Sequence, residues 1–354
     1  MDNYFSLLSE MEKQELEKYT NIIVWGFPLH THTHSYIHAM WVKVFKECFN
    51  KSVCWFHDDD FPNDFDYGNC LFITEGYCDS KIPIVESSVY FVHNAISPEK
   101  YLATGARLIE IRFNVIEIHD VNNDFNLQDG THEQMVFLSE ETKYEKLSSN
   151  KDIYFKKRNH TITPMNYECV YLYWATDLLP HEFNANNIYT TPENKIYYIG
   201  SPTHSQDLHF FKHISEKHGI QWVSVNPWNT PISFEDNKTL MHKSLLCPDF
   251  RPSGSSQDEQ EFGIKNGKNH LAIGYLPCRV LKAISYGKLG ITNSIHVKDI
   301  LKEHVVYSND MNKLFQMSIE KRNDYTHLLQ SMEYVKDRHT YFHRARDLIR
   351  ALLQ

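Results

Sequence analysis

The chain has 354 residues, of which 42% are apolar and 14% aromatic, as in a packed globular protein. Its formal net charge is −9, and no basic block is long enough to follow a phosphate backbone, which argues against nucleic acid as a partner. No apolar run approaches the roughly 20 residues of a membrane-spanning helix, which excludes such a span.

The first twenty residues carry acidic side chains and lack a basic segment followed by an apolar one. We therefore expect no secretory signal and a cytoplasmic protein, in the host cytoplasm if the chain is viral. The seven cysteines are scattered and form no C-x-x-C pair. Reduced thiols are expected rather than disulfides or a structural zinc site.

Short β-branched or aromatic runs alternate with helical patterns along the whole chain. Between the first two runs, apolar residues from Ile37 to Cys48 recur at helical spacing, as on a helix that covers a sheet. This alternation predicts α/β architecture with parallel sheets in both halves of the chain. The expected strands are 22–25, 53–56, 71–74, 89–92, 108–113, 196–199, 222–225, 289–292 and 305–307.

The length exceeds what one hydrophobic core usually supports, so we expect two domains. Residues 114–165 turn polar and predict insertions and loops rather than core. Two prolines and an asparagine-rich stretch then predict a linker, with the boundary near residue 188. The expected domains are 1–188 and 189–325, followed by a helical segment, 326–354.

Polar side chains follow four consecutive expected strands of the first half. They are His30, His32 and His34, then His57 and residues 58–60, then Thr74 and Glu75, then His93 and Asn94. In open parallel sheets, ligands bind beyond the carboxyl ends of the strands. The pattern predicts an acid/base site or a polyol-binding rim, and the candidate catalytic residues are His32, His34, Asp58 and Glu75.

A metal site is the alternative interpretation of the same histidines. The stretch "LHTHTHS" resembles the opening of polymerase-and-histidinol-phosphatase-like metallohydrolases, which implies a metal-dependent hydrolase using His30 and His32. Later strands would have to supply further ligands, such as His93, His119 and Asp120. Those enzymes need one barrel through the whole chain, whereas the second half here restarts its own strand series. We therefore expect no bound metal.

The segment "GYLPCRVLKAISYGKLGITNS", residues 274–294, predicts a helix that begins just after Pro277. Arg279, Lys282 and Tyr286 are spaced i, i+3 and i+7, so they share one face of it. Two cations near a helix N-terminus, where backbone N–H groups are free, favour a diphosphate site.

"YIGSPTHS", residues 198–205, is a second glycine-containing turn in the same half where a donor phosphate could bind. The residues expected to contact a nucleotide-sugar are Gly200, Ser201, Thr203, Gly274, Tyr275, Arg279, Lys282, Ser285 and Tyr286.

Several stretches together resemble a group of two-domain glycosyltransferases from bacteria and large DNA viruses. They are "HTHSYIH", "CWFHDDDF", "LFITEG", "WATDLLP" and "GYLPCRVLKAISYGKLGITNS", in this order between about residues 20 and 310. Residues 275–292 are also distantly similar to the donor-binding segment of GT-B fucosyltransferases. The resemblance implies a GT-B fold, with two Rossmann-like domains facing across a cleft and a C-terminal helix that crosses back to the first domain. It also implies an acceptor site in the first domain and a donor site in the second.

We therefore expect a metal-independent glycosyltransferase that moves a sugar from a UDP- or GDP-linked donor to a hydroxyl group of a glycan or glycoside. Arg279 and Lys282 would stabilise the leaving diphosphate. If the reaction inverts the anomeric centre, His32, His34, Asp58 or Glu75 would deprotonate the acceptor, and the sequence leaves this choice open. A catalytically inactive sugar-binding protein is the other alternative.

Overall fold

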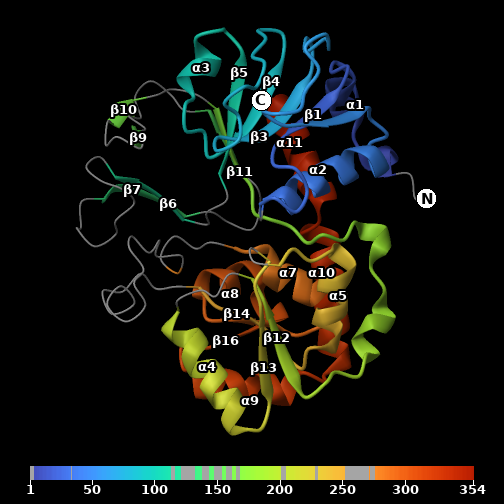
Figure 1. Cartoon of the computed structure of the whole chain (residues 1–354), viewed down its shortest axis with the longest axis vertical. Helices are drawn as coiled ribbons and strands as arrows, with labels where there is room; N and C mark the ends of the chain where they lie inside the picture. The colour runs from blue at the N-terminus through green and yellow to red at the C-terminus, as the bar shows by residue number, and fades with distance from the viewer. Residues whose placement is uncertain are drawn as a thin grey trace.

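The computed structural model describes residues 4–32, 34–112, 168–200, 205–227, 230–251, 271 and 276–354, together with 116–120, 132–137, 143–146, 154–156 and 162–164. They build two parallel-sheet α/β units, drawn one above the other in Figure 1. The expectation of α/β architecture with parallel sheets is confirmed. Among the described residues, no helix combines the length and the apolar character needed to cross a membrane.

The first unit is built on a sheet whose strands run in the order β2-β1-β3-β4-β5-β11-β8. All neighbours are parallel except β8, which is antiparallel to β11 at one edge. The carboxyl ends of β1 to β4 therefore meet at one edge of the sheet. The strands are β1 (Ile22–Trp25), β2 (Val53–Phe56), β3 (Leu71–Glu75), β4 (Val89–His93), β5 (Arg107–Arg112), β8 (Lys143–Lys146) and β11 (Glu168–Tyr171).

Helix α2 (Ser35–Glu47) covers this sheet through the apolar stripe that the sequence predicts. Its Trp41, Val44 and Phe45 are buried in one core with Val24 of β1 and Ile73 of β3. The stripe forms because residues three and four apart lie on the same side of a helix. The unit also contains η1 (Tyr4–Leu7), α1 (Glu10–Glu17) and α3 (Glu99–Leu102).

The second unit contains two parallel ladders, β12-β13 and β14-β15-β16, with β12 beside β14. Strand β14, which has Pro248 at its centre, is not among the strands expected from the sequence. The strands are β12 (Lys195–Ile199), β13 (Gln221–Val225), β14 (Cys247–Asp249), β15 (Gly290–Thr292) and β16 (Val305–Tyr307). The helices around them are α4 (Gln206–Lys217), α5 (Phe234–Lys243), α7 (Cys278–Ser285), α8 (Ile295–Leu301), η5 (Lys302–His304), α9 (Met311–Lys321) and α10 (Tyr325–Arg338).

The last helix, α11 (Tyr341–Leu352), returns to the first unit. Its Phe342, Leu348 and Ile349 are buried in the same core as α2. Helix α10 does not follow it, because Leu328 and Met332 are buried in the core of the second unit. The segment 326–354, which we expected to pack on the first unit as a whole, is thus divided between the two.

Two stretches of chain cross between the units side by side. The Thr176 N–H donates to the His339 carbonyl over 3.1 Å, and the buried Arg344 donates from Nε to the Tyr173 carbonyl over 2.7 Å. The first crossing continues through η3 (Pro180–Glu182) and η4 (Ala185–Tyr189), so the expected boundary near residue 188 falls within η4.

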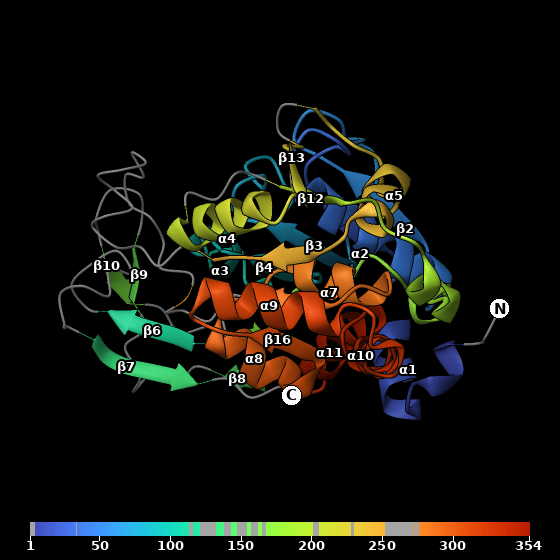
Figure 2. The same ribbon diagram turned by 90° about the horizontal axis from the view of Figure 1, so that it is seen from below.

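The polar stretch 114–165 is not loops alone. Strand β8 extends the main sheet, while β6 (Ile116–Asp120) pairs with β7 (His132–Phe137), and β9 (Tyr154–Lys156) pairs with β10 (Ile162–Pro164). The β6-β7 pair projects to one side of the molecule, away from the N-terminus (Figure 1, Figure 2).

Candidate functional site

A cavity of about 440 Å³ lies between the two units and is lined by both. It lies beyond the carboxyl ends of β1 and β12, which is where open parallel sheets bind ligands. The first unit and the crossing segment contribute His34, Tyr36, Ile37, Met40, Trp174, Ala175 and Asp177. From the second unit come Tyr198, Ile199, Gly200, Phe234, Arg251, Cys278, Arg279 and Lys282, among others.

Helix α7 points its N-terminus at this cavity. Its first residue, Cys278, lines the cavity, and the preceding Pro277 has no side chain that could cap the helix. Val280, Leu281 and Ile284 are buried against the second sheet, which fixes the orientation of the helix. The backbone N–H groups of the first turn, with the positive end of the helix dipole, therefore face the cavity.

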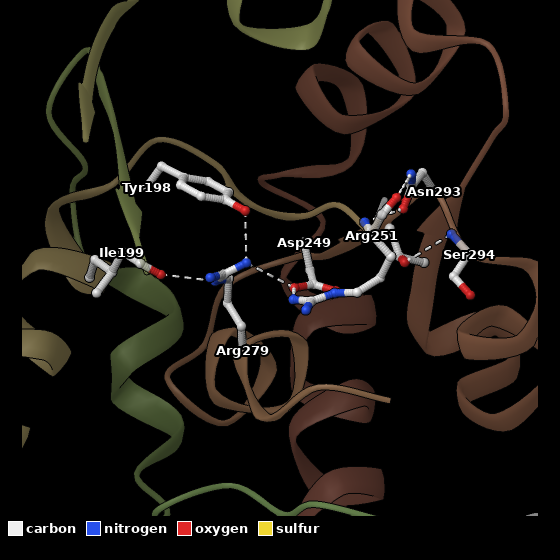
Figure 3. Close-up of polar contacts among 8 residues, drawn as sticks. Tyr198, Ile199, Asp249, Arg251, Arg279, Asn293 and Ser294 are labelled. Carbon is white, nitrogen blue, oxygen red and sulfur yellow. Dashed lines mark hydrogen bonds and ion pairs between the residues drawn. The ribbon is translucent and has the colours of Figure 1, made fainter. Parts of the chain in front are cut away.

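Three hydrogen bonds hold the Arg279 guanidinium in the wall of the cavity (Figure 3). Its Nε donates to the Ile199 carbonyl over 2.9 Å, and its Nη1 donates to the Tyr198 hydroxyl over 2.9 Å and to Asp249 Oδ1 over 3.1 Å. The guanidinium also lies 4.5 Å from the centre of the Tyr198 ring. The side chain is thus positioned before any ligand arrives.

The Asp249 carboxylate is fully buried and pairs with a second guanidinium. Arg251 donates from Nε to Asp249 Oδ2 over 3.0 Å, and Asn293 holds the Arg251 backbone by accepting from its N–H over 2.9 Å (Figure 3). Both arginines line the cavity. Among these three ionised side chains, positive charge exceeds negative charge by one.

Lys282 lies one turn further along α7. Its Nζ is 3.1 Å from Asp177 Oδ2 and 5.7 Å from the centre of the Phe234 ring. Burial alone would lower the pKa of Lys282, but the Asp177 carboxylate more than offsets this and raises it. The ammonium therefore stays charged at neutral pH, although its charge is shared with Asp177.

Ser285 and Tyr286 are placed differently from our expectation of nucleotide-sugar contacts. Both are fully buried, and neither is part of the cavity lining. The Tyr286 hydroxyl donates to Asp177 Oδ1 over 2.7 Å, while the Ser285 hydroxyl lies 2.7 Å from that of Thr176. Burial raises the pKa of Tyr286. The crossing segment covers the C-terminal end of α7, so Ser285 and Tyr286 bind that segment instead of facing the cavity.

Gly200 lies on the cavity wall directly against Arg279. Four other expected donor contacts, Ser201, Thr203, Gly274 and Tyr275, lie outside the described residues.

On the other side, the first unit contributes a histidine–carboxylate pair. His34 Nδ1 lies 2.5 Å from Glu75 Oε2, and the His34 side chain is 28% exposed whereas that of Glu75 is only 2% exposed. Burial alone would raise the pKa of Glu75, but hydrogen bonds from His34 and His93 lower it well below its usual range. Because Glu75 is ionised, we assign the Nδ1 proton of His34 to this hydrogen bond, which leaves Nε2 as an acceptor.

The other base candidates, His32 and Asp58, are not part of the cavity lining. His32 stacks on Phe27 with ring centres 4.1 Å apart, and burial lowers its pKa. Asp58 accepts hydrogen bonds from Trp25 Nε1 over 2.9 Å and from the backbone N–H of Ser80 over 3.1 Å. Burial would raise the pKa of Asp58, but these hydrogen bonds lower it. The structure therefore makes Asp58 a fastening point between two loops.

Comparison with known proteins adds nothing to this geometry. No protein-family model, curated protein or solved structure matches the chain.

Metal-ligating side chains come together in two groups within the described part of the chain. In each group the ligand atoms lie within 4.8 Å of one another. One group is His32, His34 and Glu75, and the other is the fully buried set His38, Glu75 and Cys78. Burial lowers the pKa of His38 to about 4.

Of the ligands expected for the hydrolase alternative, His32 belongs to the first of these groups, but the described residues do not bring His30 or His93 into either group. His30 is exposed, with its Nδ1 3.1 Å from the Tyr36 hydroxyl, and forms no group with His93 among the described residues. His119 and Asp120 belong to β6, which pairs with β7 in a separate two-stranded sheet, and their side chains lie outside the described residues.

Sequence reasoning missed several charged or polar residues of this site, among them Tyr36, Asp177, Tyr198, Asp249 and Arg251. The stretch "SLLCPDFR" does show an apolar run followed by charged residues, the same signal that we used in the first half. Tyr36 showed no signal, because its position depends on how α2 meets the second unit.

Proposed function

We propose that the protein is a glycosyltransferase of GT-B architecture, which transfers a sugar from a nucleoside-diphosphate-sugar to a hydroxyl group of a glycan or glycoside. In this proposal the two units are Rossmann-like domains, the second binding the donor and the first the acceptor. The observation that carries it is that one cavity has the cationic end of α7 in one wall and His34 in another. Its volume suits a ligand of this size, since such pockets span roughly 300–1,000 Å³.

The donor diphosphate is proposed to bind at the N-terminus of α7, between Arg279 and Arg251. Backbone N–H groups at a helix start bind phosphate oxygens, and guanidinium groups form strong charge-assisted bonds with them. Because Asp249 and Ile199 already fix Arg279, little reorganisation is needed when negative charge builds up on the departing diphosphate. Catalysis in this proposal therefore relies on side chains and backbone rather than on a metal ion.

The acceptor hydroxyl is proposed to lose its proton to His34 Nε2. Glu75 is a positioning residue, because it holds Nδ1–H and stabilises the imidazolium that forms. A base in this position fits an inverting displacement, in which the acceptor oxygen attacks the anomeric carbon opposite the diphosphate. Of the four base candidates from the sequence, only His34 lines the cavity.

Aromatic rings supply flat surfaces for a sugar or a nucleobase. Tyr36 of the first unit meets Phe234 of the second edge to face, with ring centres 5.3 Å apart. The Tyr36 hydroxyl also donates to the Ile232 carbonyl over 2.9 Å, which links the units across the cavity. Tyr198 forms a further part of the lining.

The decisive experiment incubates the chain with a panel of UDP-, GDP- and dTDP-sugars, with and without glycoside acceptors, and measures release of nucleoside diphosphate. We expect release with one donor, and we expect His34→Ala to lower it about a hundredfold or more. The matched control is His57→Ala, because His57 is equally exposed, at 28%, but does not line the cavity.

The outcomes separate the alternatives. Thermal stabilisation by a nucleotide-sugar without any release would favour a sugar-binding protein. Neither release nor stabilisation across the panel would refute the proposal.

A further inference from the structure

The side chains around Glu75 point to a function that sugar transfer does not require. Glu75 is almost completely buried, and its carboxylate pairs with two imidazoles: His34 at 2.5 Å and His93, whose Nδ1 lies 3.5 Å from Oε2. Among the described residues, neither a lysine nor an arginine pairs with it, and its Oε1 has no hydrogen-bond partner. A buried carboxylate oxygen without a partner is costly unless something binds it.

We propose that His32, His34 and Glu75 form a reversible binding site for a transition-metal ion, with Zn²⁺ as the best fit. Two imidazoles and a carboxylate are ligands that Zn²⁺ accepts and that Mg²⁺ or Ca²⁺ would not select. On a tetrahedral Zn²⁺ the ligand atoms lie roughly 3.3–3.5 Å apart. In this group they lie within 4.8 Å of one another, so small side-chain rotations bring them into place.

The local sequence explains why these ligands converge. His32 and His34 alternate in the loop that follows β1, and the two rings meet edge to face with centres 5.0 Å apart. Glu75 ends β3, which pairs directly with β1. His93, which ends β4, has its Nδ1 3.5 Å from the Glu75 carboxylate, where outer groups around metal ligands are typically found.

The site is open on one side, because three protein ligands leave a fourth zinc position and His34 faces the cavity. When one nitrogen of the neutral His34 ring binds zinc, the other nitrogen carries the ring proton, so neither can accept the proton of an acceptor hydroxyl. Zinc binding should therefore inhibit sugar transfer reversibly, a consequence that rests on the proposed function, whereas the metal site itself does not.

The test begins with protein stripped by a chelator and dialysed, then titrated with Zn²⁺ by calorimetry, with the bound metal counted by elemental analysis. We expect about one ion per chain and affinity lowered about tenfold or more in His32→Ala and in Glu75→Gln. The chain has 21 histidines, so the control is His57→Ala, which should bind as the wild type does. Circular dichroism and thermal melts confirm that each variant is folded.

Cys78→Ser discriminates the second, buried group from the proposed one. Unchanged binding in Cys78→Ser supports the proposal. Equal affinity in wild type and His32→Ala, or loss in Cys78→Ser alone, would overturn it.

The inhibition is measured separately, as the ratio of transfer rates with and without Zn²⁺ for each variant. We expect a strong decrease in wild type that is largely relieved in His32→Ala and reversed by chelator. Zinc binding in the expected pattern by a chain that never transfers sugar would refute the proposed function and support the metal site. If instead the protein transfers sugar at a rate that zinc does not change, and binds no stoichiometric zinc, the metal site would be refuted and the proposed function supported.

Discussion

Gly200 and Arg279 are in such close contact that a side chain at position 200 would displace the Arg279 guanidinium. A methyl group there would lie 2.0 Å from Arg279 Nη2, and the backbone of Gly200 has φ +140°, a region that other residues rarely adopt. The turn after β12 therefore packs directly against the Arg279 side chain at the N-terminal end of α7. This contact also offers a way to move the guanidinium without removing its charge.

The first prediction is that Gly200→Ala displaces the Arg279 guanidinium and weakens donor binding about tenfold or more, which nucleotide titrations would measure. The control is Gly219→Ala, since Gly219 also has positive φ, +75°, but has no atom within 4 Å of the added methyl group. Both variants should lose stability from backbone strain, on the order of 1–3 kcal/mol, but only Gly200→Ala should lose affinity. If the two variants bind the nucleotide with equal affinity, Arg279 does not take part in donor binding.

The second prediction concerns Arg279→Ala, which removes contacts to the leaving diphosphate. Two charge-assisted hydrogen bonds at about 1.5 kcal/mol each correspond to roughly a hundredfold loss in kcat/KM for the donor. Steady-state kinetics would measure it. Arg350→Ala, on the outer side of α11, removes an arginine that is 52% exposed and should leave kcat/KM unchanged. A folded Arg279→Ala variant with normal turnover would contradict the mechanism.

The third prediction tests the structural role of Tyr286. Tyr286→Phe removes the hydroxyl that donates to the buried Asp177, so the free energy of unfolding should fall by about 1–3 kcal/mol. Because Tyr286 does not line the donor cavity, KM for the donor should stay the same. Chemical denaturation and kinetics would measure the two effects. Tyr325→Phe, at an exposed position, is the control and should change neither quantity. If Tyr286→Phe raises the KM for the donor without lowering stability, Tyr286 contacts the donor and the structural role is wrong.

The fourth prediction concerns acid stability. Burial alone would raise the pKa of Glu12, but hydrogen bonds from Arg346, Ser9 and Arg350 lower it to about 2. The folded-state pKa thus lies below the unfolded value, so the ionised group stabilises the fold above about pH 5 and loses this effect as the pH falls towards 2. The difference in Tm between wild type and Glu12→Gln should shrink over that interval. A constant difference would mean that Glu12 acts through packing alone.

The sequence predicted those elements whose signal is local. Strand β1 and helix α2 lie almost where the sequence predicts them, from the apolar run Ile22–Trp25 and the stripe from Ile37 to Cys48. A strand buried on both faces shows a continuous apolar run, and a helix buried on one face shows apolar residues at helical spacing. Strand β14 shows no comparable apolar pattern, since it is three residues long and contains a proline. Its Asp249, which anchors both arginines of the cavity wall, was missed with it.

For the candidate site, spacing predicted which face a residue occupies but not what covers that face. Arg279 lies in the first turn of α7 and lines the cavity, whereas Tyr286, expected on the same helix face, follows the last residue of α7 and donates to Asp177 of the crossing segment. Likewise, the sequence gathered His32, His34, Asp58 and Glu75 at one sheet edge. The structure keeps His32, His34 and Glu75 together, with ligand atoms within 4.8 Å of one another, but it places Asp58 apart, because Asp58 is held by partners distant in sequence such as Ser80.

The return of α11 to the first unit has a consequence for how the protein is made. The core beneath α2 contains Leu348 and Ile349, so it stays incomplete while the ribosome is still adding the second unit. The apolar core of the first unit therefore stays partly exposed to solvent until α11 has been synthesised. Removal of α11 should make the first unit aggregate while the second unit still folds.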